Sequence, residues 1–167
     1  MIKTFNTLFV TMFGIGKLKP IPGTFGSLAT VIILYFLFHK FEISSNLILL
    51  GLVVIFIYSF SAVTSHTKDK ENKDPGEIVI DEFIGQSIPI YLYEISHGTD
   101  KDPSEALIFY AVCFVLFRYF DIMKPFPVSY FDKKHKNSFG VIMDDVCAGL
   151  YVVLSLICFM VLKSYIL

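Results

Sequence analysis

Five long apolar runs, each ended by polar residues, constrain most strongly how this chain can fold. The runs cover residues 28–38, 47–63, 78–93, 106–120 and 146–162. A helix that crosses the hydrocarbon core of a bilayer needs about 20 residues, and the polar flanks bring most of these runs to that length. Charged residues make up only 17% of the chain, against about 25% in soluble domains. The sequence therefore predicts an all-α, multi-helical integral membrane bundle of about five apolar helices.

The first and third runs are the least typical of spanning helices. The first is short, and the third carries Asp81 and Glu82 near its start and Pro89 within it. Carboxylates are costly in hydrocarbon, and proline interrupts the hydrogen bonding of a helix. We expect the third run to be either a kinked spanning helix or a partly inserted one. The sequence shows no repeat or linker, so residues 1–167 are predicted to form one membrane-embedded domain.

The N-terminal residues resemble an interfacial amphipathic segment more than a signal peptide. They lead into a Pro/Gly-rich segment, residues 17–27, where a signal peptide would have small residues at a cleavage site. We therefore expect them to belong to the mature protein.

The distribution of lysine and arginine predicts the orientation of the bundle, because cytoplasmic loops are enriched in these residues. With five spanning helices and a cytoplasmic N-terminus, eleven basic residues lie on the cytoplasmic side and three, Lys40, Lys101 and Lys163, on the other. The same topology brings residues 17–27, the pair Asp81 and Glu82, and residues 118–145 to one membrane face. The sequence thus predicts that three distant polar clusters meet at the cytoplasmic face.

Two pairs of adjacent carboxylates stand near the starts of apolar runs, Asp81 with Glu82 and Asp144 with Asp145. Either pair alone is explained equally well by the favourable placement of acids at a helix N-terminus. Both pairs at one membrane face favour a cation site, because Mg²⁺ prefers hard oxygen ligands. We predict that these four carboxylates bind the metal. In each pair a glycine follows one carboxylate by four residues, which leaves room for another helix or a ligand.

Arg118, Asp121 and Lys124 lie along one side of a predicted helix that ends before Pro125. They could form an exposed ladder of charges at the lipid boundary. The alternative that we favour is phosphate binding by Arg118 and Lys124, with Asp121 either binding metal or orienting the arginine. Arg118 is the only arginine in the chain.

Residues 17–27 also offer an anion site. Thr24 and Ser27 supply hydroxyl groups, and a glycine-bearing turn at a helix N-terminus exposes backbone N–H groups. We predict that both hydroxyls bind substrate. His66 lies on the same face and is of interest as a catalytic group if it lies near Asp81. The net charge of −1 gives no basic surface for nucleic acid.

Four blocks in this order resemble the phosphatidylglycerophosphatase A family of bacterial membrane lipid phosphatases. They are GTFGSL at 23–28, IVIDEFIG at 78–85, FRYFDIMKPFP at 117–127 and FGVIMDDVCAG at 139–149. The resemblance implies Mg²⁺-dependent removal of the terminal phosphate of phosphatidylglycerophosphate, giving phosphatidylglycerol, at the cytoplasmic face of the bacterial inner membrane. Its matching functional residues would be Asp81, Glu82, Arg118, Asp121, Lys124, Asp132, Asp144 and Asp145. Asn137 and Ser138 stand where such proteins commonly have two glycines.

Among these residues we assign catalytic roles to Asp81, Glu82, Arg118, Asp121, Lys124 and Asp145. Which carboxylate is a general base or a nucleophile stays open. The main alternative function is a small ion transporter or channel subunit in which intramembrane carboxylates line a pathway. The acids gather at one end of the helices, which argues against a pathway across the membrane.

Overall fold

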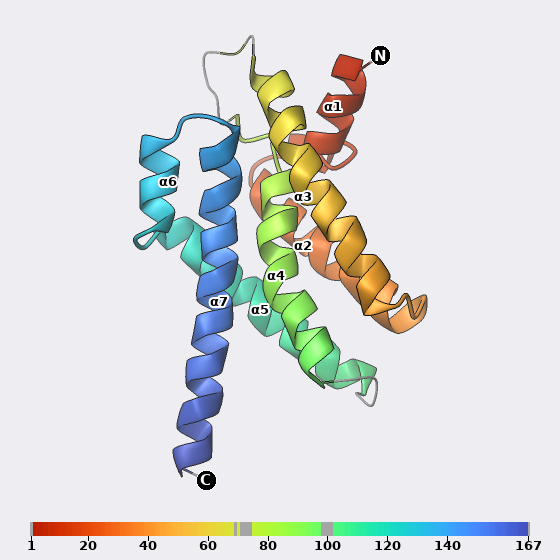
Figure 1. The fold of residues 1–167 in the computed structure, drawn as a ribbon, viewed down its shortest axis with the longest axis vertical. Helices are drawn as coiled ribbons and strands as arrows, with labels where there is room; N and C mark the ends of the chain where they lie inside the picture. The colour runs from red at the N-terminus through yellow and green to blue at the C-terminus, as the bar shows by residue number, and fades with distance from the viewer. Residues whose placement is uncertain (1, 69, 71–74, 98–101, 167) are drawn as a thin grey trace.

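The structure is a computed structural model that describes residues 2–68, 70, 75–97 and 102–166. Within these ranges all regular structure is helical (Figure 1), which confirms the predicted all-α class. Lys73 and Lys101, which contributed to the predicted charge asymmetry, lie outside the described residues. The α-helices are α1 (Ile2–Val10), α2 (Pro22–Tyr35), α3 (Ser45–Thr67), α4 (Ile80–His97), α5 (Pro103–Met123), α6 (Val128–Lys134) and α7 (Ser138–Ile166).

In the described part of the chain, four helices are long and apolar enough to cross a membrane: Pro22–Lys40, Ser45–Thr67, Pro103–Met123 and Ser138–Tyr165. The first spans 19 residues because α2 continues into a π-helical segment, Phe36–Lys40. The short first apolar run therefore belongs to a helix of spanning length. These four helices and their exposed apolar side chains identify a membrane protein.

The third predicted apolar run forms α4, which lies at the centre of the bundle and contacts α2, α3, α5 and α7. It is not among the four spans, since its 18 residues carry three carboxylates, Asp81, Glu82 and Glu94; Pro89 also lies inside it. Its side chains are nevertheless mostly buried against its neighbours. The position of α4 places its acidic first turn inside the protein.

Two glycines allow α4 and α7 to come into backbone contact. A Cβ atom on Gly85 would lie 2.4 Å from the carbonyl oxygen of Asp145, and one on Gly149 would lie 2.3 Å from the carbonyl oxygen of Gly85. The small surface predicted beside each acidic pair is thus used for helix packing. Because Gly85 follows Asp81 by one turn and Gly149 follows Asp145 by one turn, this contact sets the distance between the two acidic pairs.

The helix directions bring the polar clusters together. α2, α4 and α7 begin, and α3 and α5 end, towards the upper part of Figure 1. α5 starts at Pro103, where Asp102 caps it by accepting a hydrogen bond from the N–H of Ser104 at 2.9 Å. It ends at Met123, just before Pro125, as the proline predicted, and Lys124 adopts a left-handed conformation. Lys124 is thereby turned back towards the start of α7.

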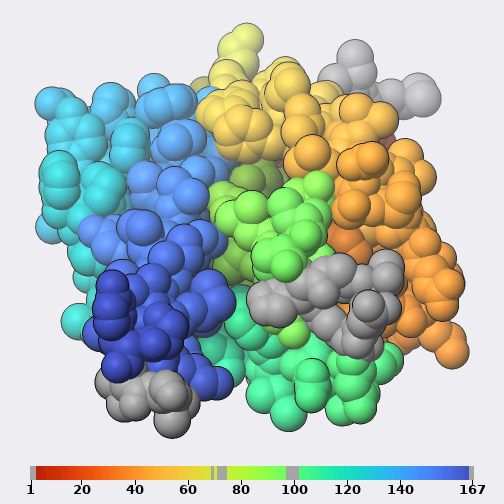
Figure 2. Space-filling model, turned by 60° about the horizontal axis from the view of Figure 1, so that its bottom comes forward, coloured from red at the N-terminus to blue at the C-terminus, as the bar shows by residue number. Residues whose placement is uncertain are grey.

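The opposite end of the bundle is brought forward in Figure 2, where the last turns of α7 (dark blue) stand at the edge of the molecule. Most side chains in this part of α7 are exposed, including Leu154, Phe159 and Leu162. An apolar helix surface of this kind is suited to contact with lipid.

Candidate functional site

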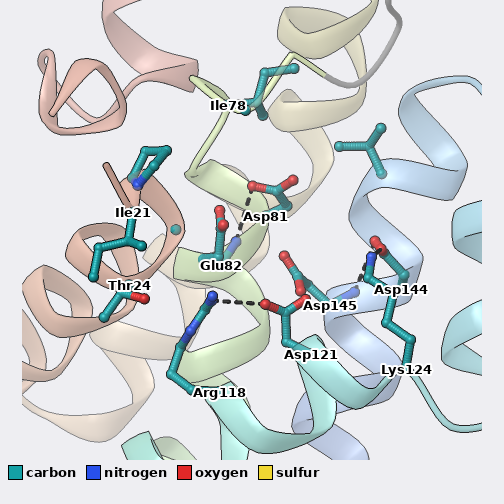
Figure 3. Close-up of a pocket in the computed structure, with 14 residues that line it drawn as sticks. Ile21, Thr24, Ile78, Asp81, Glu82, Arg118, Asp121, Lys124, Asp144 and Asp145 are labelled. Carbon is teal, nitrogen blue, oxygen red and sulfur yellow. Dashed lines mark hydrogen bonds and ion pairs between the residues drawn. The ribbon is translucent and has the colours of Figure 1, made fainter. Parts of the chain in front are cut away.

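A cavity of about 260 Å³ lies where the starts of α2, α4 and α7 meet the end of α5 (Figure 3). The predicted meeting of the polar clusters is confirmed, because all of them contribute to its wall. The lining residues are Ile21, Pro22, Gly23, Thr24, Gly76, Ile78, Asp81, Glu82, Arg118, Asp121, Lys124, Val141, Asp144 and Asp145.

Three carboxylates in this cavity are close enough to share one cation. Oxygen atoms of Asp81, Glu82 and Asp145 lie within 4.8 Å of one another. Oε2 of Glu82 and Oδ1 of Asp145 are buried and have no hydrogen-bond partner among the described residues. Buried carboxylate oxygens usually have a partner, so this donor set fits a hard divalent cation such as Mg²⁺.

Asp144, the fourth predicted metal ligand, is not part of this group of three carboxylates and instead contacts Lys124. Its Oδ2 accepts a hydrogen bond from Nζ of Lys124 at 2.7 Å, and Lys124 also donates to Asp132 at 2.8 Å. Burial alone would lower the pKa of Lys124, but the two carboxylates outweigh this effect and raise its pKa. Lys124 therefore stays protonated and provides a fixed positive charge, while Asp132 lies behind it and does not line the cavity.

Arg118 provides the second positive charge. Its Nη1 lies 2.8 Å from Oδ2 of Asp121, so Asp121 orients the guanidinium group (Figure 3). The same nitrogen is 3.4 Å from Oγ of Ser27, and Nε has no partner among the described residues. Part of the guanidinium group is thus held in place, and Nε is left to bind another acceptor.

The first turn of α2 closes one side of the cavity. Pro22 is its first residue, and the preceding Ile21 offers no side-chain cap to the free backbone N–H groups. A Cβ atom on Gly23 would lie 2.2 Å from Oε1 of Glu82 and 3.3 Å from Nη1 of Arg118. Glycine thus lets the helix N-terminus approach these two side chains closely, and this end of the helix favours an anion.

The two predicted substrate-binding hydroxyls differ in position. Thr24 lines the cavity. Ser27 is fully buried outside its wall, donates to the carbonyl oxygen of Gly23 at 2.9 Å and contacts Arg118. Substrate binding by Thr24 stays a prediction, whereas the contacts of Ser27 favour a role in supporting Arg118.

The acidic pair of α7 lies deeper in its helix than the sequence indicated. The helix begins at Ser138, with the side chain of Asn137 accepting a hydrogen bond from the N–H of Gly140 at 3.1 Å. Asp144 and Asp145 are therefore more than a turn inside α7. The favourable interaction of acids with a helix N-terminus falls off within the first turn, so it does not explain this pair.

His66 lies outside the cavity wall. Its Nε2 is 3.0 Å from Oε1 of Glu77, and its Nδ1 is 3.2 Å from Oγ1 of Thr7. Lys70 forms an ion pair with the same carboxylate oxygen of Glu77 and lowers the pKa of Glu77. These contacts hold the segment that leads into α4.

Charge in the cavity is unbalanced. Its lining includes five carboxylates and two cationic side chains. A phosphate group brings further negative charge, and buried like charges repel each other strongly at short distance. Added positive charge, such as that of a divalent cation, would therefore favour phosphate binding here.

Several lining residues could not be identified from the sequence. Four of them have no polar side chain, and only their place in the fold brings them to the wall: Ile21, Gly76, Ile78 and Val141. The sequence offered only a weak indication of Ile78 and Val141, which lie three residues before Asp81 and Asp144.

Comparisons with a family profile and with individual proteins identify the same family. The sequence profile of the phosphatidylglycerophosphatase A family matches residues 8–160. A protein of that name from Haemophilus influenzae is 39% identical over 147 residues, covering 88% of this chain and 83% of the relative. Phosphatidylglycerophosphatase A from Escherichia coli is 32% identical over 144 residues, covering 85% and 76% of the two chains.

A third relative, from Bacteroides thetaiotaomicron, has been provisionally named a phosphatidylinositol-3-phosphatase. It is 32% identical over 145 residues, covering 86% of each chain. No solved structure matches this protein at a significant level.

Proposed function

The chain belongs to the phosphatidylglycerophosphatase A family, and on that premise we propose that it hydrolyses the terminal phosphate ester of phosphatidylglycerophosphate to give phosphatidylglycerol. The observation that carries this proposal is the cavity with three clustered carboxylates beside Arg118, Lys124 and a helix N-terminus. We further propose that residues 1–167 act as one domain.

The size of the cavity supports a lipid substrate whose headgroup alone enters it. A volume of about 260 Å³ is below the usual 300–1,000 Å³ of pockets that enclose a whole ligand. The acyl chains would remain among the apolar helices in the bilayer. Because the cavity lies at the end of the bundle richer in lysine, we propose that it opens at the cytoplasmic face of the inner membrane. The phosphatidylglycerol formed there would remain in that membrane.

Asp81, Glu82 and Asp145 would hold Mg²⁺, and their two unpartnered oxygen atoms support this assignment. When bound, the metal supplies positive charge to the phosphate and lowers the pKa of a water ligand. Asp144 contributes negative charge at the edge of this group while it holds Lys124.

Arg118, Lys124 and the first turn of α2 would bind the phosphate oxygens. Asp121 keeps the guanidinium group in place, and the cations stabilise negative charge that develops as the phosphoryl group is transferred. Water attacks phosphorus, the bond between phosphorus and the ester oxygen breaks, and the departing glycerol oxygen takes up a proton from solvent. One of the clustered carboxylates would accept the proton that the water loses.

Phosphate release from purified protein in detergent tests this function. We expect release from phosphatidylglycerophosphate with Mg²⁺, and loss of release when the metal is chelated. No release under any condition would remove the phosphatase proposal and favour the ion-transport alternative.

The relative from Bacteroides thetaiotaomicron gives a reason to test a second substrate. Phosphatidylinositol 3-phosphate also carries a phosphate monoester on a lipid headgroup. Faster release from this lipid than from phosphatidylglycerophosphate would reassign the substrate but keep the reaction. Phosphatidic acid, in which the phosphate is attached directly to the diacylglycerol, serves as the comparison for headgroup length.

A further inference from the structure

Gln86 is a buried polar residue that the proposed reaction does not use. Its side chain is fully buried, and both the amide nitrogen and the amide oxygen lack a hydrogen-bond partner in the described part of the chain. Exchanging the two atoms would not change this, so the orientation of the amide is not the cause. Gln86 follows Glu82 by four residues, so the two side chains share one face of α4.

Two groups that line the cavity are also incompletely satisfied. Glu82 and Arg118 both border Gly23, and Oε2 of Glu82 and Nε of Arg118 have no partner among the described residues. These groups are complementary to the amide, because Nε of Arg118 donates a hydrogen bond and Oε2 of Glu82 accepts one. Buried polar groups of this kind are generally satisfied by protein or by ordered water.

We propose that Gln86 is a positioning residue whose amide holds Glu82 and Arg118 through an ordered internal water. An amide both donates and accepts, so it can serve a carboxylate and a guanidinium group without adding charge to the site. The inference rests on the proposed function, in which Glu82 binds the metal and Arg118 binds phosphate. Groups that orient metal ligands in this way commonly affect metal affinity or activity by 10- to 100-fold.

Gln86→Met tests this role because methionine has nearly the same length and removes both hydrogen-bonding functions. The readout is Mn²⁺ binding by the full chain in detergent, measured by electron paramagnetic resonance without substrate. We expect Mn²⁺ affinity to fall by about tenfold or more. We expect the thermal midpoint to change little, because methionine keeps nearly the same side-chain volume in the core.

Ser87→Ala is the matched control on the same helix. Ser87 is also buried, but its hydroxyl group donates to the carbonyl oxygen of Phe83 at 2.6 Å and does not line the cavity. This variant should keep the Mn²⁺ affinity of the wild type.

A folded Gln86→Met variant with wild-type Mn²⁺ affinity would overturn the inference alone. A wild-type protein that binds no Mn²⁺ would overturn the metal proposal and this inference together. If Gln86→Met does not fold, the proposal is tested instead by an experimental structure of the wild type at a resolution that shows ordered water. Water within hydrogen-bonding distance of the Gln86 amide is expected there, and an amide surrounded only by apolar side chains would contradict the proposal.

Discussion

Replacing Gly85 by alanine should separate the two acidic pairs without removing any of their side chains. The added Cβ atom would lie 2.4 Å from the carbonyl oxygen of Asp145 and 2.7 Å from Cε2 of Phe117. Ordinary contacts begin near 3.4 Å, so α4 and α7 must move apart by about 1 Å. A displacement of about 1 Å at a reacting centre costs about 10²-fold in rate, and overpacking costs about 1–3 kcal/mol of stability.

The assay is phosphate release from phosphatidylglycerophosphate, measured together with the thermal midpoint. Gly85→Ala should lower kcat by about 10²-fold and lower the midpoint. Gly149→Ala tests the same contact from α7, where the new Cβ atom would lie 2.3 Å from the carbonyl oxygen of Gly85.

Gly51→Ala is the control for both variants, because nothing lies within 4 Å of its added Cβ atom in α3. It should keep full activity, and its free energy of unfolding should rise by about 0.5–1 kcal/mol, since alanine is the better helix former. Wild-type turnover in Gly85→Ala would refute the idea that this backbone contact sets the geometry of the site.

Three further predictions follow from the cavity and its surroundings. Asp145→Asn should abolish phosphate release and weaken Mn²⁺ binding while membrane insertion, checked by membrane fractionation, is unchanged; near-normal turnover would contradict the metal assignment. Gly23→Ala should reduce kcat/KM, but less than Gly85→Ala does, because the atom it meets is the movable end of Glu82. Glu77→Gln should flatten the fall in thermal midpoint at acidic pH: Lys70 lowers the pKa of Glu77, so this pair stabilises the protein above the usual glutamate pKa of about 4.5 and the effect is lost as the pH falls below it. An unchanged acid profile in Glu77→Gln would show that the pair contributes no net stability.

The polar clusters could be predicted from the sequence because charge is scarce in this chain. A small number of charged residues between apolar runs leaves few arrangements that keep them out of hydrocarbon. The alternation of lysine-rich and lysine-poor loops then placed Asp81, Arg118 and Asp145 at one end of the bundle. That end contains the cavity.

Contacts between side chains could not be predicted in the same way. The sequence treated Asp144 and Asp145 as equivalent, but they are about 100° apart around α7 and reach different partners. Lys124 binds Asp144 only because its left-handed backbone turns it back towards α7. Gln86 gave no signal, since a glutamine in an apolar run is identified as unsatisfied only when its surroundings are known.

The length of α7 can be compared with the thickness of the bilayer. At 1.5 Å per residue, its 29 residues extend for about 43 Å, more than the roughly 30 Å thickness of the hydrocarbon core. Lys163 follows Asp145 by 18 positions, which corresponds to about 27 Å along the helix and matches that thickness. With Lys163 at one boundary, the carboxylates would lie at the other, level with the lipid headgroups. Bilayer thickness would then set the depth of the acidic side chains to the depth at which a phospholipid presents its phosphate.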